Sequence, residues 1–259
     1  MSDCILIDFA DGVATITLNR PDKGNAINLD MARRLADIAI ICDEDPAVRC
    51  VVLTANGKMF CVGGDIGAFG AASESVPALL KSITAAMHSA IARFMRMDKP
   101  LICAINGPAA GAGLGLALMG DLVIAAKSAH FTMAYTAIGL TPDGATTWLL
   151  PRLVGMRRAQ EMAISNRRVG AEEGVSLGLI TRVADDALLA DEVRLSAGTL
   201  AKAATHAVGA VRSLLLSSYL NPLEAHLELE SRGISDAARG THGREGIQAF
   251  LEKRKPVFG

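Results

Sequence analysis

The stretch from Leu101 to Gly120 constrains the fold most strongly, because twenty consecutive residues include no charged side chain. Its length is about that needed to cross a bilayer as a helix. It also contains Asn106, Pro108 and five glycines, and residues of these types interrupt a helix. We therefore expect no membrane span here, but a buried strand over 101–105, a glycine-containing turn, and a short apolar helix over 114–119.

The rest of the chain alternates between strand-like and helix-like patterns up to about residue 190. Apolar alternation on both sides of Asp11-Gly12 predicts a hairpin, and Asn28 is suited to cap a following helix. Further elements are predicted as short strands at 50–54 and 122–126 and a helix at 76–95. From about Leu188 the pattern is helical. The sequence therefore predicts an α/β fold, with a core over 1–195 and a helical region over 196–259.

The composition excludes several classes of partner. The formal net charge is -1 and 51% of the residues are hydrophobic, so no basic surface points to nucleic acid or to an anionic membrane. The five cysteines are scattered and odd in number, which favours free buried thiols in a reducing, cytoplasmic location. No cysteine or histidine pair has the spacing of metal ligands, so no metal is expected.

Two glycine-containing turns follow predicted strands, at Phe60–Ile66 and at Ile105–Gly113. Glycine lets the backbone approach a ligand and leaves amide N–H groups uncovered. Two such amides directed at one oxygen would form an oxyanion hole, although both turns could also be tight connections and nothing more. The glycines at 111, 113 and 115 do not fit the spacing of a dinucleotide fingerprint, so a nicotinamide enzyme is not expected.

Four ordered motifs resemble the crotonase (enoyl-CoA hydratase/isomerase) superfamily, and together they cover essentially the whole chain. They are the segments Leu18–Ile27, Phe60–Ile66, Ile105–Gly113 followed by Asp121–Ala125, and Phe250–Phe258. The resemblance implies a spiral of ββα units with a C-terminal helical trimerisation region. It also implies a homotrimer, or a hexamer made of two trimers, as the assembly.

The resemblance also implies how the chain would bind an acyl-CoA substrate. The oxyanion amides would be those of Gly64 and Ala112. Coenzyme A would be held as part of the substrate, with no permanently bound cofactor. The expected contacts are Val62, Gly64 and Ile66 along the adenine, Lys253, Arg254 and Lys255 at the phosphates, and Phe258 near the acyl or pantetheine region. The basic residues could act across a subunit boundary, or could form a solvated tail.

Two departures from the family pattern are informative. A typical hydratase of this family has two glutamates, at the positions of Gly115 and Tyr135 here. Addition of water requires one group that activates the water and another that delivers a proton, and paired carboxylates suit that task. We therefore expect isomerase chemistry rather than simple hydration.

One carboxylate remains at a position that matters in the family. Asp143 matches the aspartate of dienoyl-CoA isomerases and of ring-opening phenylacetyl-CoA epoxide isomerases, and one carboxylate can remove a proton from one carbon and return it to another. Asp143 could instead only cap the helix expected to begin near Gly144. Asp65, after the first turn, is expected to pair with nearby backbone N–H groups.

Two further interpretations stay open. His88 and Asp143 match residues of 4-chlorobenzoyl-CoA dehalogenase, in which Asp143 would attack an aromatic ring and His88 would activate water. His88 could equally be a satisfied residue at the edge of the core, or could line the acyl pocket together with Tyr135. Because both glutamates are missing, a CoA-binding pseudoenzyme without activity is the alternative outside enzymes.

Overall fold

The computed structural model describes residues 3–258 and begins with the predicted hairpin. Strands β1 (Ile5–Ala10) and β2 (Val13–Leu18) pair in antiparallel fashion. The two turn residues, Asp11 and Gly12, have φ angles of 51° and 77°. Two successive left-handed residues are what a two-residue hairpin turn requires, so the Asp-Gly pair closes the hairpin as the sequence predicts.

A six-stranded sheet forms the centre of the molecule, in the order β1-β2-β3-β4-β6-β9. From β2 onward its neighbours are parallel. The added strands are β3 (Cys50–Ala55), β4 (Leu101–Ile105), β6 (Leu122–Ala126) and β9 (Arg182–Ala184). Their side chains alternate between two faces, so that Val51 and Leu53 enter one apolar cluster while Cys50 and Val52 enter another.

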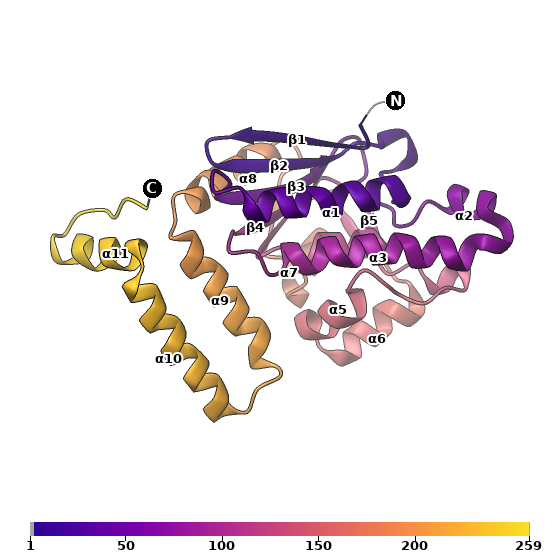
Figure 1. Ribbon diagram of the computed structural model, residues 1–259. Coiled ribbons are helices and arrows are strands. Elements are labelled where there is room, and N and C mark those ends of the chain that lie inside the picture. The colour runs from indigo at the N-terminus through magenta and orange to yellow at the C-terminus, as the bar shows by residue number, and fades with distance from the viewer. Residues whose placement is uncertain (1–2, 259) are drawn as a thin grey trace.

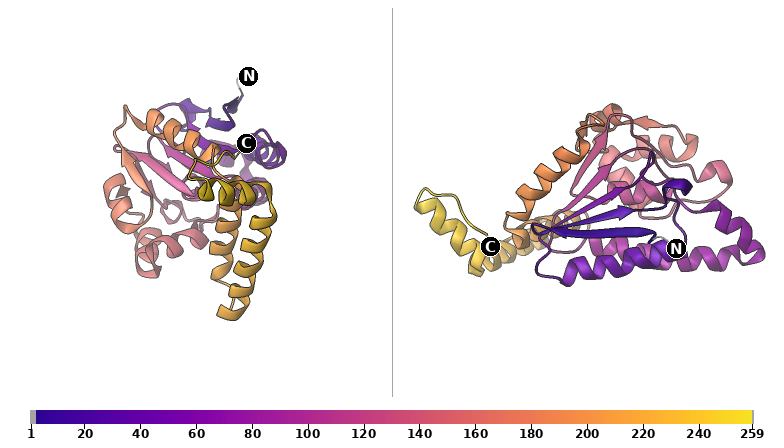
Figure 2. Two further views of the ribbon diagram at one scale, coloured as in Figure 1. Left: turned by 90° about the vertical axis from the view of Figure 1, so that its left-hand side faces the viewer. Right: turned by 90° about the horizontal axis from the view of Figure 1, so that it is seen from above.

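Helices cover both faces of this sheet (Figures 1 and 2). Helices α1 (Leu29–Glu44) and α3 (Val76–Phe94) lie side by side over one face, and α8 (Leu189–Ala201) packs on the other. The Asn28 side chain caps α1 by accepting a hydrogen bond of 2.9 Å from Met31 N–H, as predicted. The five cysteines are free and four of them are buried. Burial raises the pKa of Cys42 to about 11.

A second, three-stranded sheet gives the chain its repeating ββα path. Its strands are β5 (Ala109–Ala110), β7 (His130–Thr132) and β8 (Val169–Gly170). The chain passes from β4 through β5 into α4 (Ala112–Leu118), and then from β6 through β7 toward α5 (Thr146–Val154) and α6 (Met156–Ser165). The segment after β3 follows the same path, since Cys61 forms an isolated parallel bridge with Ala109 of β5. The predicted α/β spiral of ββα units is confirmed.

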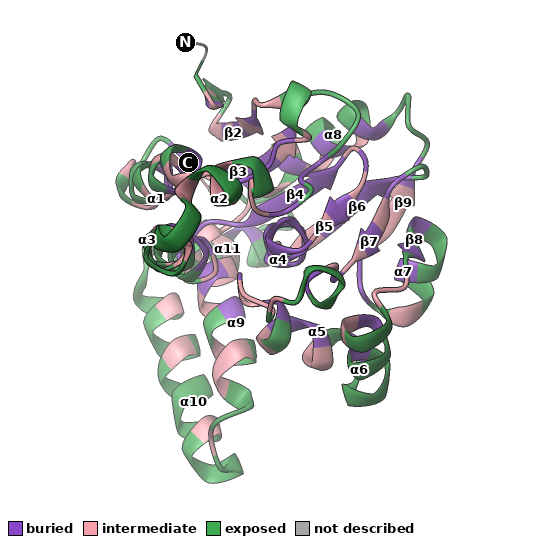
Figure 3. Ribbon diagram, turned by 90° about the vertical axis from the view of Figure 1, so that its right-hand side faces the viewer, coloured by how far each residue is buried: buried purple, intermediate pink, exposed green. Residues whose placement is uncertain are grey.

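The charge-free stretch is divided as the sequence predicts. It forms β4, the turn to β5, and α4, and every residue of α4 is buried. Figure 3 shows this short helix at the centre of the molecule, surrounded by strands and helices. Within residues 3–258, no helix is both long enough and apolar enough to cross a membrane.

The last three helices project from the core (Figures 1 and 2). They are α9 (Thr205–Ser218), α10 (Leu223–Arg239) and α11 (Thr241–Leu251). The predicted boundary between residues 195 and 196 falls inside α8, which α7 (Ala171–Leu177) and β9 precede. Because Ala197 and Ala201 of α8 are buried against the sheet, the change from core to projecting helices comes after Ala201.

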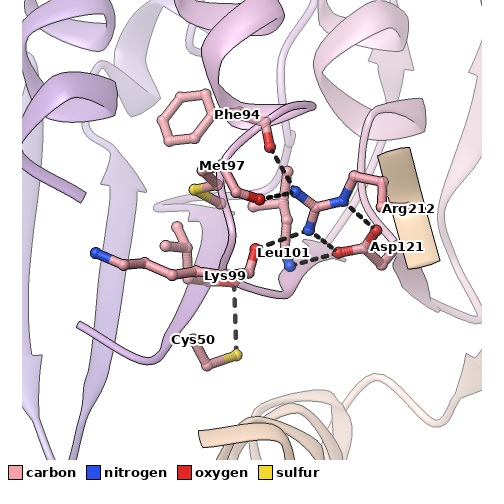
Figure 4. A network of polar contacts seen from close by, with 8 residues as sticks. Cys50, Phe94, Met97, Lys99, Leu101, Asp121 and Arg212 are labelled. Atoms are coloured by element: carbon pink, nitrogen blue, oxygen red, sulfur yellow. Dashed lines mark hydrogen bonds and ion pairs between the residues drawn. The ribbon is translucent and has the colours of Figure 1, made fainter. Parts of the chain in front are cut away.

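Arg212 fixes α9 to the core (Figure 4). Its side chain is buried, and its guanidinium contacts both carboxylate oxygens of Asp121, with Nε 2.6 Å from Oδ1. It also donates to the carbonyl oxygens of Met97 at 2.6 Å and Lys99 at 2.7 Å. A guanidinium offers five N–H donors, so one side chain satisfies several buried acceptors and joins α9 to the segments before β4 and β6.

Replacement of Arg212 by methionine should therefore destabilise the protein strongly. The change removes the guanidinium donor of the Met97 and Lys99 carbonyl oxygens and leaves Asp121 with the N–H of Leu101. Removal of one partner of a buried pair costs about 3 kcal/mol. Urea denaturation followed by circular dichroism measures the change. Arg232→Met is the matched control, because Arg232 pairs with Glu228 on the exposed side of α10 and its loss should not be measurable. Equal midpoints for the two variants would contradict this role of Arg212.

Candidate active site

A cavity of about 380 Å³ lies where the two glycine-containing turns meet α3 and the segment before α5. A volume of this size is within the range of small-molecule sites. Most of its lining is apolar, and the polar exceptions include Thr84, Tyr135 and Asp143. The backbone of Gly64 and Ala112 also faces this space. Chain segments predicted to carry chemistry thus converge on one apolar cavity.

The first turn directs the Gly64 amide away from its neighbouring strand. Ile27 N–H donates to Gly63 O at 2.8 Å, and Asp65 N–H donates to Ile27 O at 2.9 Å. The residues on either side of Gly64 thus hydrogen-bond to Ile27, and Gly64 forms a parallel bridge with it. In an extended chain successive peptide groups point in opposite directions, so the N–H of Gly64 points away from Ile27, on the side of the cavity.

The second turn leaves the Ala112 amide free of the helix that it begins. Ala112 is the first residue of α4, and the preceding Gly111 is the N-cap with a φ of 54°. The first N–H groups of a helix have no partner within it. Ala112 lines the same cavity as Gly64. Within residues 3–258 neither amide donates to a backbone carbonyl, so two backbone donors are left around one space.

Contact between two glycines brings these turns together. A Cβ atom on Gly63 would lie 3.1 Å from Ala110 O and 3.5 Å from Gly111 Cα. Gly63 has a φ of 97°, a region that side chains rarely adopt. Any larger residue at this position would separate the turns and with them the two amides. The glycines therefore do more than form tight connections.

Arg20 and Asp65 hold the first turn in place. Arg20 Nη2 lies 2.8 Å from Asp65 Oδ2, and Asp65 Oδ1 accepts from Ala68 N–H at 3.1 Å, which caps α2 (Ile66–Ala72). Burial alone would raise the pKa of Asp65, but the hydrogen bonds from Arg20 and Ala68 outweigh it, so that the pKa is lowered. The predicted pairing of Asp65 with nearby backbone N–H groups is confirmed.

The sequence analysis assigned no role to Asn25, which is fully buried. Its Nδ2 donates to Asn56 O at 2.9 Å and to Met59 O at 2.8 Å, and its Oδ1 accepts from Arg20 N–H at 2.8 Å. Asn25 has a φ of 54°. The dipeptide Gly24-Asn25 carried a signal for it, since both residue types tolerate left-handed backbone.

Phe69 was also missed. A Cβ on Gly64 would lie 2.6 Å from the Cζ atom of Phe69, so this ring covers the first turn and lines the cavity. Together with Tyr135 it supplies aromatic surface that the low aromatic content did not predict. Val62 and Ile66 line the rim of the same cavity and are 37% and 54% exposed.

Asp143 and Tyr135 form a pair inside the cavity. The Tyr135 hydroxyl donates to Asp143 Oδ1 at 2.5 Å. Burial raises the pKa of Tyr135, and the adjacent carboxylate raises it further, so the phenol stays protonated and acts as a donor. The interpretation of Asp143 as a helix cap is wrong, because the N-cap of α5 is Ala145 and no side chain caps that helix.

Gly115 explains why a glutamate is absent from α4. A Cβ on this residue would lie 1.9 Å from Gly144 O and 2.9 Å from Gly144 C. The backbone next to Asp143 thus occupies the space into which a side chain at 115 would extend. The aspartate and a glutamate at 115 cannot occupy this arrangement together, and among the described residues that line the cavity Asp143 is the one carboxylate.

His88 lies outside this cavity, contrary to the expectation that it lines the acyl pocket. Its Nε2 accepts a hydrogen bond of 3.2 Å from Gly144 N–H, and its side chain faces a separate groove between α3, α5 and α9. The peptide chain of residues 143–145 separates His88 from the space that Asp143 faces.

The C-terminal residues are not brought to the cavity within one chain. Arg254 Nη1 lies 2.6 Å from Glu245 Oε1, and its Nε lies 2.6 Å from Glu252 Oε2. Phe258 packs edge to face against His242, with ring centroids 5.4 Å apart, and its carbonyl accepts from Arg49 at 2.9 Å. Phe258 therefore does not line the acyl region of its own chain. A role of Lys253, Arg254 and Lys255 across a subunit boundary stays a prediction.

Comparison with known proteins defines the family. The sequence profile described as Enoyl-CoA hydratase/isomerase matches residues 8–259. The chain is 40% identical over 259 residues to 1,2-epoxyphenylacetyl-CoA isomerase of Escherichia coli (strain K12), covering 100% of this chain and 99% of that one. It is 34% identical to 4-chlorobenzoyl coenzyme A dehalogenase-2 of Arthrobacter sp, covering 96% and 91%.

Solved structures agree with this result. An enoyl-CoA hydratase from Polaromonas sp. JS666 superposes with a TM-score of 0.94 at 31% identity, covering 98% of this chain and 99% of that one. The chain belongs to the enoyl-CoA hydratase/isomerase family and has the crotonase fold. Acyl-CoA thioesters are the substrates that this family membership indicates.

The space beside Gly115 generates a stability prediction. Gly115→Ala should lower the free energy of unfolding by about 2 kcal/mol, because the added methyl group overpacks a filled site. Gly198→Ala is the control, since Gly198 lies in α8 with no atom within 4 Å of a Cβ and alanine there should stabilise the helix by about 0.5–1 kcal/mol. Thermal and urea unfolding measure both, and equal effects of the same sign would contradict the packing described.

Proposed function

We propose that the protein is an acyl-CoA isomerase that works through a thioester enolate with one acid–base carboxylate. The observation that carries this proposal is the position of the Asp143–Gly144 backbone. It fills the space beside Gly115 and places one carboxylate in the cavity that the amides of Gly64 and Ala112 face. A single carboxylate supports proton transfer between two carbons better than addition of water.

In the proposed reaction, Asp143 removes a proton from a carbon near the thioester. The charge that develops on the thioester oxygen is stabilised by the N–H groups of Gly64 and Ala112, which is the strongest general contribution in enzymes of this kind. Tyr135 holds Oδ1 of Asp143, so Oδ2 is the oxygen able to take the proton. The same carboxylic acid then returns the proton to a different carbon, and the apolar walls keep water away.

The comparisons support an isomerase without deciding it. The relative from Escherichia coli is named an isomerase, whereas the Polaromonas structure is named a hydratase. The epoxide isomerase name, together with the rings of Phe69 and Tyr135 in the cavity, favours a substrate whose acyl group is cyclic. We include aryl and ring substrates in the test for this reason.

Dehalogenation with Asp143 as nucleophile and His88 as base receives less support. The Nε2 atom of His88 accepts from Gly144 N–H, and the histidine lies behind the turn rather than in the cavity. It could activate water at the Asp143 carboxylate only after this contact had broken. The inactive CoA-binding alternative is tested directly by the absence of any turnover.

Binding of coenzyme A is proposed to involve two parts of the assembly. Val62 and Ile66, exposed at the rim, would lie along the adenine, and Lys253 and Lys255 of a neighbouring subunit would meet the phosphates. The projecting helices support a trimer or hexamer, because large apolar side chains on them such as Leu215, Ile234 and Phe250 are 64%, 73% and 83% exposed. The free thiols support the expected cytoplasmic location.

Asp143→Asn should slow isomerisation strongly and leave binding intact. General acid–base groups contribute about 10²–10⁴-fold to rate, so we expect kcat to fall within that range while the affinity for a saturated acyl-CoA stays unchanged. The assay incubates 2-enoyl, 3-enoyl, dienoyl, ring-containing and aryl CoA thioesters in D₂O. Mass spectrometry then follows deuterium entry beside the thioester, and ultraviolet absorbance follows the position of the double bond.

Asp236→Asn, which removes an exposed carboxylate on α10, is the matched control and should keep full activity. Rapid hydration of a short enoyl-CoA by the wild-type protein would reject the proposed reaction. Binding of every thioester without turnover or deuterium exchange would instead support the non-catalytic alternative.

A further inference from the structure

The backbone that carries Asp143 has a conformation that needs support from outside. Gly144 and Ala145 have φ angles of 60° and 62°, so two successive residues lie in the left-handed region. For alanine this conformation costs roughly 1–2 kcal/mol. Such strain persists only where the surrounding structure holds it, and the contacts of this turn therefore decide where the carboxylate points.

The peptide group between Asp143 and Gly144 is held at both of its ends. Its carbonyl oxygen accepts from Thr146 Oγ1 at 2.8 Å, from Thr146 N–H at 3.2 Å and from the Tyr135 hydroxyl at 3.3 Å. Its N–H donates to His88 Nε2 at 3.2 Å. This peptide directly follows the Cα atom of Asp143, so holding it fixes the backbone from which the carboxylate extends.

His88 reaches the peptide from the side opposite the substrate cavity. It extends from α3 into a groove of about 580 Å³, which Trp148 of α5 and Leu220 after α9 also line. A Cβ atom on Gly144 would lie 3.5 Å from Ala112 Cα and 3.5 Å from Met87 Cε. The turn at 143–145 thus packs against α4 on one side and contacts the His88 imidazole on the other.

We propose that His88 is a positioning residue, which in its neutral form holds the Asp143–Gly144 peptide by accepting the Gly144 N–H, and whose protonation releases the turn. This inference rests on the proposed role of Asp143 as the acid–base group. A neutral imidazole has one nitrogen with a free lone pair, whereas both nitrogens of an imidazolium are donors. Protonated His88 therefore cannot accept, and two N–H groups would face each other.

Few charged groups surround His88. Arg96, two residues after the end of α3, lines the same groove, and Arg152 of α5 stacks on Trp148 at 4.0 Å. The α9 residues that line the groove, Ser213, Leu216 and Ser217, are uncharged. Asp143 directs its carboxylate to Tyr135, away from the groove. No carboxylate lines the groove to pair with a protonated His88. Protonation therefore acts on the hydrogen bond between Gly144 N–H and His88 Nε2.

Kinetics separate this role from a general structural one. His88→Leu should lower kcat about tenfold, the effect of losing one hydrogen bond to the strained turn, with KM unchanged because the cavity walls are intact. His88→Gln should restore most of kcat, since its Oε1 accepts the same N–H and does not titrate. The acid limb of kcat should differ between the wild type and His88→Gln, because glutamine cannot take up a proton and keeps its acceptor.

Ser89→Leu is the matched control, an exposed neighbour on the same helix given the same side chain, and it should retain wild-type kinetics. Circular dichroism and binding of a saturated acyl-CoA check that each variant is folded. Unchanged kcat in His88→Leu, or an identical acid limb in wild type and His88→Gln, would overturn the proposal.

A second measurement does not depend on turnover. In the Asp143→Asn protein labelled with ¹⁵N-glycine, the Gly144 amide resonance should shift with pH as His88 titrates, and the same resonance should not shift in the Asp143→Asn, His88→Gln protein. Failure of the isomerase proposal would leave this shift in place. A Gly144 amide shift that does not change as His88 is protonated would contradict the proposed hydrogen bond itself.

Discussion

Close approach of backbone to backbone around α4 is the constraint on which the site depends. Two segments, the turn at 60–66 and the turn at 143–145, lie so near this short helix and its leading turn that side chains are excluded at three contacts. Gly111 meets Gly63, a Cβ on Gly113 would lie 2.2 Å from Cys61 O, and Gly115 lies under Gly144. Glycine is costly in a helix, by roughly 1 kcal/mol relative to alanine, and here the cost is offset by packing that no other residue permits.

This packing sets the chemistry because it decides which groups share the cavity. The contact at Gly63 brings together two turns that each leave one amide unpaired, and the contact at Gly115 brings in the turn that carries Asp143. Arg20, Asp65 and Asn25 support the first turn with hydrogen bonds, and Tyr135 and Thr146 support the last. Preorganised donors of this kind stabilise charge without rearrangement during the reaction.

The sequence alone predicted the elements and the family, since hairpin, capped helix and buried strands each leave a local pattern. It also identified Gly64, Ala112 and Asp143 as residues of interest. It could not place His88, because a helix face shows which residues are apolar but not which turn from another segment will lie against them. The burial of Asn25, the cover that Phe69 gives to Gly64 and the ion pairs of Arg254 also depend on contacts between distant segments, which periodicity does not encode.

The contact between Gly115 and Gly144 also has an evolutionary consequence. A chain with glycine at this position cannot accommodate a glutamate there by one substitution, because the carbonyl oxygen of Gly144 occupies the place of its first side-chain carbon. The turn at 143–145 would have to move first, and that movement would displace Asp143. Exchange between one-carboxylate and two-carboxylate sites therefore requires coordinated changes in two segments that are distant in the sequence.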